Sequence, residues 1–243
     1  MSYLVLIHQI IAHLALLGLL VYFPVKYWVV TFAMYFILYC FGGTITYHRL
    51  LSHNSFKAPV WFYYLGSILG LLACAGSPIA WVATHKKHHR FSDKKNDPHS
   101  MLFKKWFQVQ WLSMLEPAEV KYATHLLRSQ FQLFLHRHYF TIHLSYAAIL
   151  ALVDFKLLIY FYLAPAALVW EGGSVINTIC HKWGYSNYPL EDQSRNNHVV
   201  AWLTFGEGFH NNHHAKQTQF EFSRNPNEFD IGGFFIKLIR HKA

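Results

Sequence analysis

The chain has 243 residues, of which 53% are hydrophobic and only 14% are charged, and its formal net charge is +9. Such an apolar composition is atypical of a soluble globular domain and favours a membrane protein. The positive charge does not indicate a nucleic-acid partner, because the sequence contains no basic helix and no recognised nucleic-acid motif. We therefore expect the lipid bilayer to be the principal surroundings of this chain.

Two apolar segments occupy the first fifth of the chain. Residues 4–23 and residues 27–47 are each long enough, at about 1.5 Å per residue, to cross about 30 Å of hydrocarbon. Pro24 lies in the short connection between them, which predicts a tight antiparallel hairpin. The motif HRLLSH, from His48 to His53, then follows directly outside the membrane.

Residues 60–82 are also apolar and allow two interpretations. A true third span would place the later motif HKKHH on the opposite side of the membrane from HRLLSH. If the two motifs share one site, this segment must be re-entrant or interfacial instead. Gly76, Ser77 and Pro78 offer a break for such a reversal. We favour the reversal and keep the third span as the alternative.

The rest of the chain continues this pattern. Residues 91–137 are polar and aromatic and predict an interfacial helical region, whereas residues 139–153 and 157–180 predict a second hairpin of spans. Lysine and arginine gather on the side that carries the histidines, which predicts that this side is cytoplasmic. The expected fold is therefore an all-α membrane protein in one domain, 1–243, with four transmembrane helices in two hairpins and a cytosolic helical cap.

Histidines recur with one spacing at two distant places. In THKKHHRF, His85, His88 and His89 fall at i, i+3 and i+4 and share a helix face, with the fixed positive charges on the other face. The motif GEGFHNNHH repeats the spacing. Because metal ligation requires neutral imidazoles, bound metal would make this concentration of basic residues tolerable.

Two further groups bring the total to nine histidines, enough for a di-metal site. Five residues turn an α-helix by about 140°, so His48 and His53 are expected to serve two neighbouring ions rather than one. Asn177 and His181 stand at i and i+4 at the end of the last span. Imidazole-rich coordination suits iron, copper, nickel or zinc. The candidate ligands are His48, His53, His85, His88, His89, Asn177, His181, His210, His213 and His214.

Taken together, HRLLSH, HKKHH with the following FSDKKNDPH, NTICH and GEGFHNNHH resemble the membrane fatty acid desaturases, in particular the stearoyl-type (delta-9) acyl-CoA and acyl-lipid branch. The resemblance covers essentially the whole chain. It implies two iron ions and oxygen-dependent insertion of a cis double bond into a long acyl chain. It also implies two ligand sets. One set contains His48, His85, His89 and His210, with Asn177 acting through water, and the other contains His53, His88, His181, His213 and His214.

The resemblance implies partners and leaves alternatives open. The expected electron donor is a ferredoxin or a b-type cytochrome with its reductase, and the expected location is a bacterial inner membrane or the endoplasmic reticulum. VATHKK lacks the Arg-Asp pair that acyl-CoA enzymes of the family often have, so acyl-CoA and acyl-lipid substrates both stay open. A di-iron hydroxylase is the alternative enzyme, and a metal transporter is the alternative of another class.

Some residues have a weaker case for the site. Asp97 and Glu171 are possible partners that orient a ligand, although a turn or cap suits Asp97 and a hydrogen-bonded pair with Tyr, Trp or His suits Glu171. His8 and His143 lack the repeated spacing, and packing or an interfacial position explains them. Cys74, like the other two cysteines, lies alone in an apolar stretch and is not expected to bind metal.

Overall fold

The computed structural model describes residues 2–113 and 116–241, and every regular element in that part of the chain is a helix. In chain order the helices are α1 (Ser2–Tyr22), α2 (Val25–Phe36), η1 (Ile37–Ser52), α3 (Val60–Leu72), α4 (Pro78–Phe91), α5 (Trp106–Trp111), η3 (Val120–Arg128), α6 (Gln130–Arg137), α7 (Tyr139–Val153), α8 (Phe155–Leu157), η4 (Leu158–Leu163), α9 (Ala164–Ile179), α10 (His198–Leu203), α11 (His210–Ala215) and α12 (Ile231–Ile239). The predicted all-α class is confirmed for the described residues.

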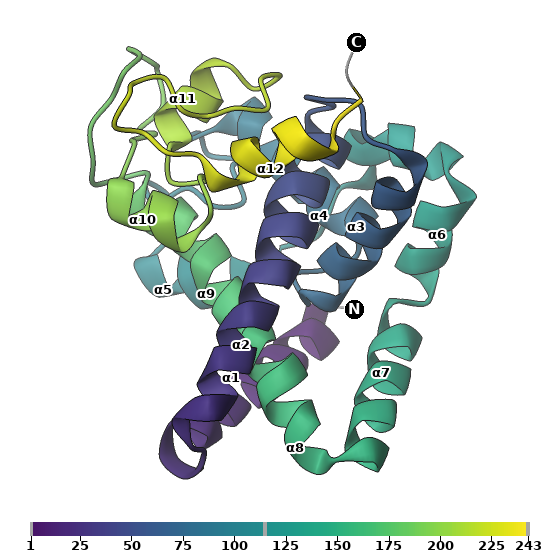
Figure 1. Cartoon of the computed structure of the whole chain (residues 1–243). Helices are drawn as coiled ribbons and strands as arrows, with labels where there is room; N and C mark the ends of the chain where they lie inside the picture. Colours follow the sequence, from purple (N-terminus) through teal and green to yellow (C-terminus); the bar gives the residue numbers. More distant parts are fainter. Residues whose placement is uncertain (1, 114–115, 242–243) are drawn as a thin grey trace.

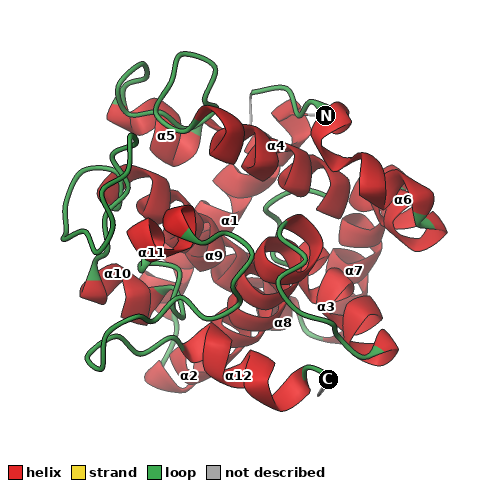
Figure 2. Ribbon diagram, turned by 90° about the horizontal axis from the view of Figure 1, so that it is seen from above, coloured by secondary structure: helices red, strands yellow, loops and turns green. Residues whose placement is uncertain are grey.

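Three helices are long and apolar enough to cross a membrane: Tyr3–Tyr22, Val25–Ser52 and Phe155–Ile179. They match three of the four predicted spans. The fourth, α7, has 15 residues and at about 1.5 Å per residue covers only about 22 Å. Figure 1 shows α1, α2, α7 and α8 extending from a layer that contains α4, α10, α11 and α12. Seen from above, loops connect the short helices of that layer (Figure 2).

The segment predicted to reverse is two helices rather than one. α3 ends at Leu72, and α4 begins at Pro78 after a turn in which Cys74 and Gly76 both have positive φ. Ser77 caps the new helix, because its Oγ accepts a hydrogen bond from the backbone N–H of Ala80. The turn returns the chain to η1, so that the histidines of α4 approach those that follow the second span.

η1 is a π-helix of 16 residues, an uncommon structure at this length. Its i to i−5 pattern is reinforced by side chains. Thr46 Oγ1 donates to the carbonyl of Phe41 at 2.7 Å, and Ser52 Oγ donates to that of Tyr47 at 2.8 Å. The backbone N–H of His53 continues the pattern to the carbonyl of His48, at 3.3 Å. The second span therefore ends with a wider helix where it carries its histidines.

Glycines allow η1 and α3 to pack at backbone contact. A Cβ atom on Gly42 would lie 2.4 Å from the backbone nitrogen of Gly70 and 2.5 Å from the carbonyl carbon of Leu69. We expect Gly42→Ala to lower stability by roughly 1–3 kcal/mol, because backbone atoms cannot move aside as a flexible side chain can. Thermal unfolding of the detergent-purified protein measures this effect.

Gly18→Ala is the matched control for that variant. Gly18 also lies in an apolar helix, but an added Cβ there has no atom within 4 Å. The expected change is neutral or stabilising by about 0.5–1 kcal/mol, since alanine has the higher helix propensity. A Gly42→Ala protein as stable as Gly18→Ala would show that the contact between η1 and α3 is not tight.

Candidate metal centre

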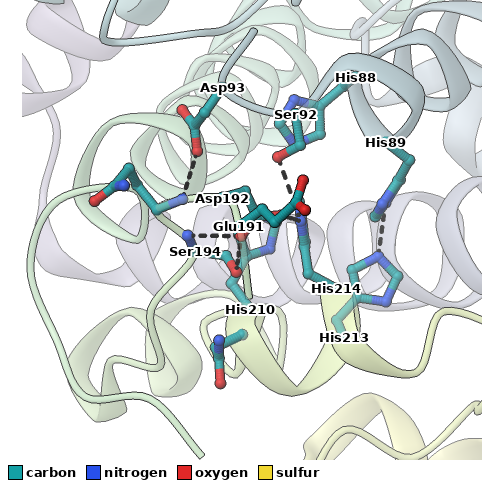
Figure 3. A network of polar contacts seen from close by, with 12 residues as sticks. His88, His89, Ser92, Asp93, Glu191, Asp192, Ser194, His210, His213 and His214 are labelled. Carbon is teal, nitrogen blue, oxygen red and sulfur yellow. Dashed lines mark hydrogen bonds and ion pairs between the residues drawn. The ribbon is translucent and has the colours of Figure 1, made fainter. Parts of the chain in front are cut away.

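Five histidines form the first histidine cluster: His48, His53, His85, His89 and His213, whose ligand atoms all lie within 4.8 Å of one another. Their Nε2 atoms converge. Those of His53 and His85 are 2.8 Å apart, and that of His213 lies 2.9 Å from the Nε2 atoms of both His48 and His89. Figure 3 shows His89 and His213 pointing toward one another. The second span, α4 and α11 therefore meet at one point.

Four histidines, all buried, form the second histidine cluster: His88, His181, His210 and His214. The Nε2 atoms of His181 and His210 are 3.0 Å apart. The two clusters are neighbours, because the rings of His89 and His214 have centroids 4.6 Å apart. The structure thus brings all nine predicted histidines together in two adjacent groups.

In four of these rings the Nδ1 atom, which faces away from the cluster, contacts a carboxylate oxygen. This contact favours the tautomer with the proton on Nδ1 and leaves the Nε2 lone pair facing the cluster. The four pairs are His48 with Glu207, His88 with Asp97 at 2.9 Å, His181 with Asp93 at 2.8 Å and His214 with Asp192 at 2.7 Å. Figure 3 shows Asp192 and Asp93 beside the second cluster. This arrangement orients imidazoles in the way that metal sites require.

The electrostatics of the clusters favour neutral imidazoles. Burial, and then the neighbouring histidines, lower the pKa of His85 and His213 well below the usual value. Burial also lowers the pKa of His214 to about 4. For His88 burial acts in the same direction, but Asp97 outweighs it and the pKa is raised. His89 behaves like His85, because burial and the neighbouring histidines lower its pKa as well, so two of the three histidines in HKKHH favour the neutral form.

The residues present fit a bound cation. Nε2 of His88 and Nε2 of His214 are buried without a hydrogen-bond partner, although both point into the second cluster. A proton can satisfy only one pair of Nε2 atoms at a time, whereas a positive ion among them would accept lone pairs from all four or five converging rings. Both clusters can therefore hold a metal ion through nitrogen atoms alone.

The division into two ligand sets differs from the one that the resemblance implies. His53 and His213 belong with His48, whereas His210 belongs with His181. The expectation that His48 and His53 serve two different ions assumed α-helical geometry. In the π-helical pattern that joins them, residues five apart lie nearly one turn apart, so both rings reach the same cluster.

A cavity of about 440 Å³ reaches both clusters. His48 and His85 of the first cluster and His88 and His210 of the second line it, together with Asn177. Most of the remaining lining is apolar or small: it includes Val5, Gly43, Gly70, Ala73, Ala75, Gly76, Ala80, Val169, Trp170 and Ile176. An apolar lining with a few convergent polar groups is typical of ligand pockets. The site can therefore present an apolar ligand directly to the histidines.

Glu171 contacts none of the nine cluster histidines, so the structure does not give it a role in orienting one of them. Its carboxylate pairs with His13 at 2.9 Å and accepts hydrogen bonds from Gln110 at 2.6 Å and Trp111 at 2.9 Å. This is the hydrogen-bonded alternative considered for it. The carboxyl joins α1 and α5 to α9, which explains why a charged group is tolerated in an apolar helix.

Sequence reasoning also missed Glu207 and Arg49, which lie beside the first histidine cluster. Glu207 and Arg49 are buried, and Glu207 Oε1 accepts hydrogen bonds from the Arg49 guanidinium at 3.2 and 3.3 Å. Burial opposes ionisation of Glu207, but His48 and Arg49 lower its pKa. From the sequence, Arg49 is one of several basic residues on the side that carries the histidines. Its position immediately after His48 was the available signal that it belongs to the site.

The model of the fatty acid desaturase family matches residues 26–219 of this chain. The match covers most of the chain, including all nine histidines, and the chain therefore belongs to the fatty acid desaturase family. It is an oxidoreductase that desaturates fatty acyl groups. The class predicted from the histidine motifs is confirmed.

Three relatives illustrate the range of the family around this chain. It is 34% identical over 227 residues to an acyl-CoA C20 delta5-desaturase of Anemone leveillei, covering 89% of this chain and 71% of the relative. It is 34% identical over 233 residues to the sn-1 stearoyl-lipid 9-desaturase of Synechocystis sp., covering 92% and 73%. A chloroplastic palmitoyl-monogalactosyldiacylglycerol delta-7 desaturase of Arabidopsis thaliana is 36% identical over 222 residues, covering 87% and 59%.

Proposed function

We propose that the chain is an oxygen-dependent, di-iron desaturase that introduces a cis double bond at the delta-9 position of a long-chain acyl substrate. The observation that carries the proposal is the pair of adjacent all-nitrogen clusters opening on one apolar cavity. Bound iron would supply the oxidant for an unactivated C–H bond, using dioxygen and two electrons from an outside donor. Zinc in the same ligands would be redox-inert.

The protein residues position the metals and the acyl chain. The first cluster would hold one ion through five imidazoles and the second would hold the other through four. Asn177, which lines the cavity one helical turn before His181, would complete the second set through a water molecule. The apolar lining would bind the acyl chain, exclude bulk water and determine which C–H bonds face the metals.

The relatives support a long acyl chain but differ in what carries it. One is named for an acyl-CoA substrate and another for a stearoyl lipid, and the delta-9 position rests on the latter. The missing Arg-Asp pair before HKKHH leaves both carriers open. Purified protein assayed with stearoyl-CoA and with a stearoyl glycerolipid distinguishes them, since the true carrier gives the higher rate of product formation.

The test of the reaction is expression in a bacterium that lacks delta-9 desaturase activity, followed by gas chromatography of the total fatty acids. We expect a new cis-9 monounsaturated acid, with the double bond located by mass spectrometry of its dimethyl disulfide adduct. A hydroxylated acid of the same chain length would instead identify the hydroxylase. A double bond at another carbon would overturn the delta-9 assignment while leaving desaturation intact.

The proposed topology is four spans with α3 and α4 re-entrant, in one domain covering 1–243, and with the histidine clusters on the cytoplasmic side. Exposed basic residues on that side would receive an acidic electron donor such as a ferredoxin or a b-type cytochrome. The location is a bacterial inner membrane or the endoplasmic reticulum. Single-cysteine labelling at Lys94, which is exposed beside the clusters, tests the orientation in sealed vesicles.

Asp97 is proposed to orient His88 for metal binding. Its Oδ1 contacts the ring, while Oδ2 accepts the backbone N–H of Asp93 at 2.8 Å, so the carboxylate is itself fixed. We expect Asp97→Asn to weaken iron retention or lower activity by about 10–100-fold, as replacement of such partners does elsewhere. Iron per chain and double bonds formed per minute measure both effects.

Asp154→Asn is the control for Asp97→Asn. Asp154 is exposed and caps α8, at the end of the spans away from the histidines, where its Oδ1 accepts the backbone N–H of Lys156. Asparagine is an equally good helix cap, so activity and iron content should stay unchanged. Equal behaviour of the two variants would contradict the role of Asp97.

A further inference from the structure

A second kind of polar cluster lies away from the nine histidines. His8 of α1, Cys74 in the turn after α3 and His143 of α7 place their ligand atoms within 4.8 Å of one another. The hydroxyl of Tyr162, in η4, contacts all three. We call these residues the Cys74 cluster. Four separate segments of the chain therefore converge on one sulfur atom.

The two sulfur–nitrogen distances are close to the edge length of a metal tetrahedron. Cys74 Sγ lies 3.7 Å from His8 Nε2 and 3.7 Å from His143 Nδ1. Zinc–nitrogen and zinc–sulfur bonds of about 2.0–2.3 Å require ligand atoms roughly 3.3–3.6 Å apart. The Tyr162 oxygen lies 3.2 Å from His8 Nε2, 3.5 Å from Cys74 Sγ and 2.5 Å from His143 Nδ1. The last distance is that of a hydrogen bond, so His143 would exchange its bond to Tyr162 for the bond to the metal.

The cysteine is held in this position by the backbone. The backbone φ angle of Cys74 is +63°, a value that residues other than glycine rarely adopt. The side-chain amide of Gln9 donates to its carbonyl oxygen at 2.9 Å. Cys74 is completely buried and His143 is 5% exposed, with its Nε2 atom lacking a partner. The thiol is therefore fixed beside two imidazoles in a setting that excludes bulk water.

We propose that His8, Cys74 and His143 form a third metal site, which binds one thiophilic cation of the zinc type with tetrahedral geometry. Binding replaces the thiol proton, which leaves to solvent, with the metal. The site is structural: it ties α1 and α7 to the turn between α3 and α4. Ala73, Ala75 and Gly76 in that turn line the cavity, so the ion would also fix one wall of the substrate site.

Sulfur distinguishes this site from the catalytic clusters, which offer nitrogen ligands only. Purified protein in detergent is titrated with Co²⁺, which replaces zinc and gives a thiolate-to-cobalt charge-transfer band in the near ultraviolet. We expect the wild-type protein to show this band at one equivalent per chain, and added Zn²⁺ to remove it. Cys74→Ser should abolish the band, and His143→Gln, which keeps the thiol, should weaken Co²⁺ binding by at least about 10-fold.

The two other cysteines provide matched controls. Cys40 and Cys180 are also buried thiols, but neither belongs to a group of metal-ligating side chains in the described residues. Cys40→Ser and Cys180→Ser should keep the band, and so should His213→Ala, which removes a catalytic ligand. A wild-type protein without the band, or a band that survives in Cys74→Ser, would overturn the proposal. The cluster would then be a metal-free hydrogen-bond network. If Cys74→Ser does not fold, an unchanged affinity in His143→Gln overturns it equally.

Discussion

Replacing His213 by alanine is expected to abolish desaturation. Its Nε2 atom lies 2.9 Å from those of His48 and His89, and its ring is completely buried, so it stands at the centre of the first cluster. Loss of this ligand should reduce product formation by more than ~100-fold, beyond the effect of losing a partner that only orients a ligand. Gas chromatography of cellular fatty acids measures the loss, and elemental analysis of the purified protein measures iron.

The second cluster supplies the companion experiment. His181→Ala removes one of its four ligands and should be equally inactive, because the proposal requires both ions. His241→Ala is the control, since that ring is exposed in the C-terminal segment and belongs to neither cluster. Full activity in His181→Ala with normal iron in the first cluster would reduce the proposal to a single-metal enzyme.

The sequence was sufficient to predict the helices and the convergence of the histidines. Apolar runs predicted three helices that are long and apolar enough to cross a membrane, and Gly76 with Pro78 predicted the break between α3 and α4. The convergence of the histidine motifs was predicted from their expected share in one metal centre. Histidine motifs that share one metal centre must lie on one side of the membrane, and this fixes how the chain passes between them.

The division of ligands was not predictable, because it depends on local helix geometry. On an α-helix, His48 and His53 would point in different directions. The i to i−5 hydrogen bonds of η1 bring the two side chains together. Nothing in residues 37–52 specifies that helix type from propensity alone. Its side-chain bonds, such as that of Thr46 to a carbonyl five residues earlier, are visible only once the fold is known.

Sequence reasoning missed carboxylates that contact the cluster histidines for a different reason. Asp93 contacts His181, 88 positions away in the sequence, and no local pattern relates two such residues. Asp192 likewise contacts His214 from 22 positions away. Metal ligands can be recognised by mutual spacing within a helix, whereas the groups that orient them come from loops whose course is set by tertiary packing.

Arg49→Gln is expected to have the largest effect on stability. The guanidinium is completely buried and donates to Asp230 at 2.8 and 3.0 Å, to Glu207 and to the carbonyl of Phe220 at 2.7 Å, while its Cζ atom lies 3.8 Å from the centroid of the Phe222 ring. Removing the cation leaves two buried carboxylates without their charge partner, which typically costs about 3–5 kcal/mol. The expected result is a large fall in the thermal unfolding temperature and in the yield of monodisperse protein.

Lys57→Gln tests whether burial, rather than positive charge, is responsible. From the sequence Lys57 and Arg49 are equivalent basic residues on the same side of the membrane, but Lys57 is exposed. Its loss should change stability by less than ~0.5 kcal/mol. Arg49→Lys refines the test: lysine keeps the charge but cannot bridge Asp230 and Glu207 with a planar group, so intermediate stability is expected. If Arg49→Gln were as stable as Lys57→Gln, the buried network would not hold the C-terminal segment to η1, and Glu207 would orient His48 without help from Arg49.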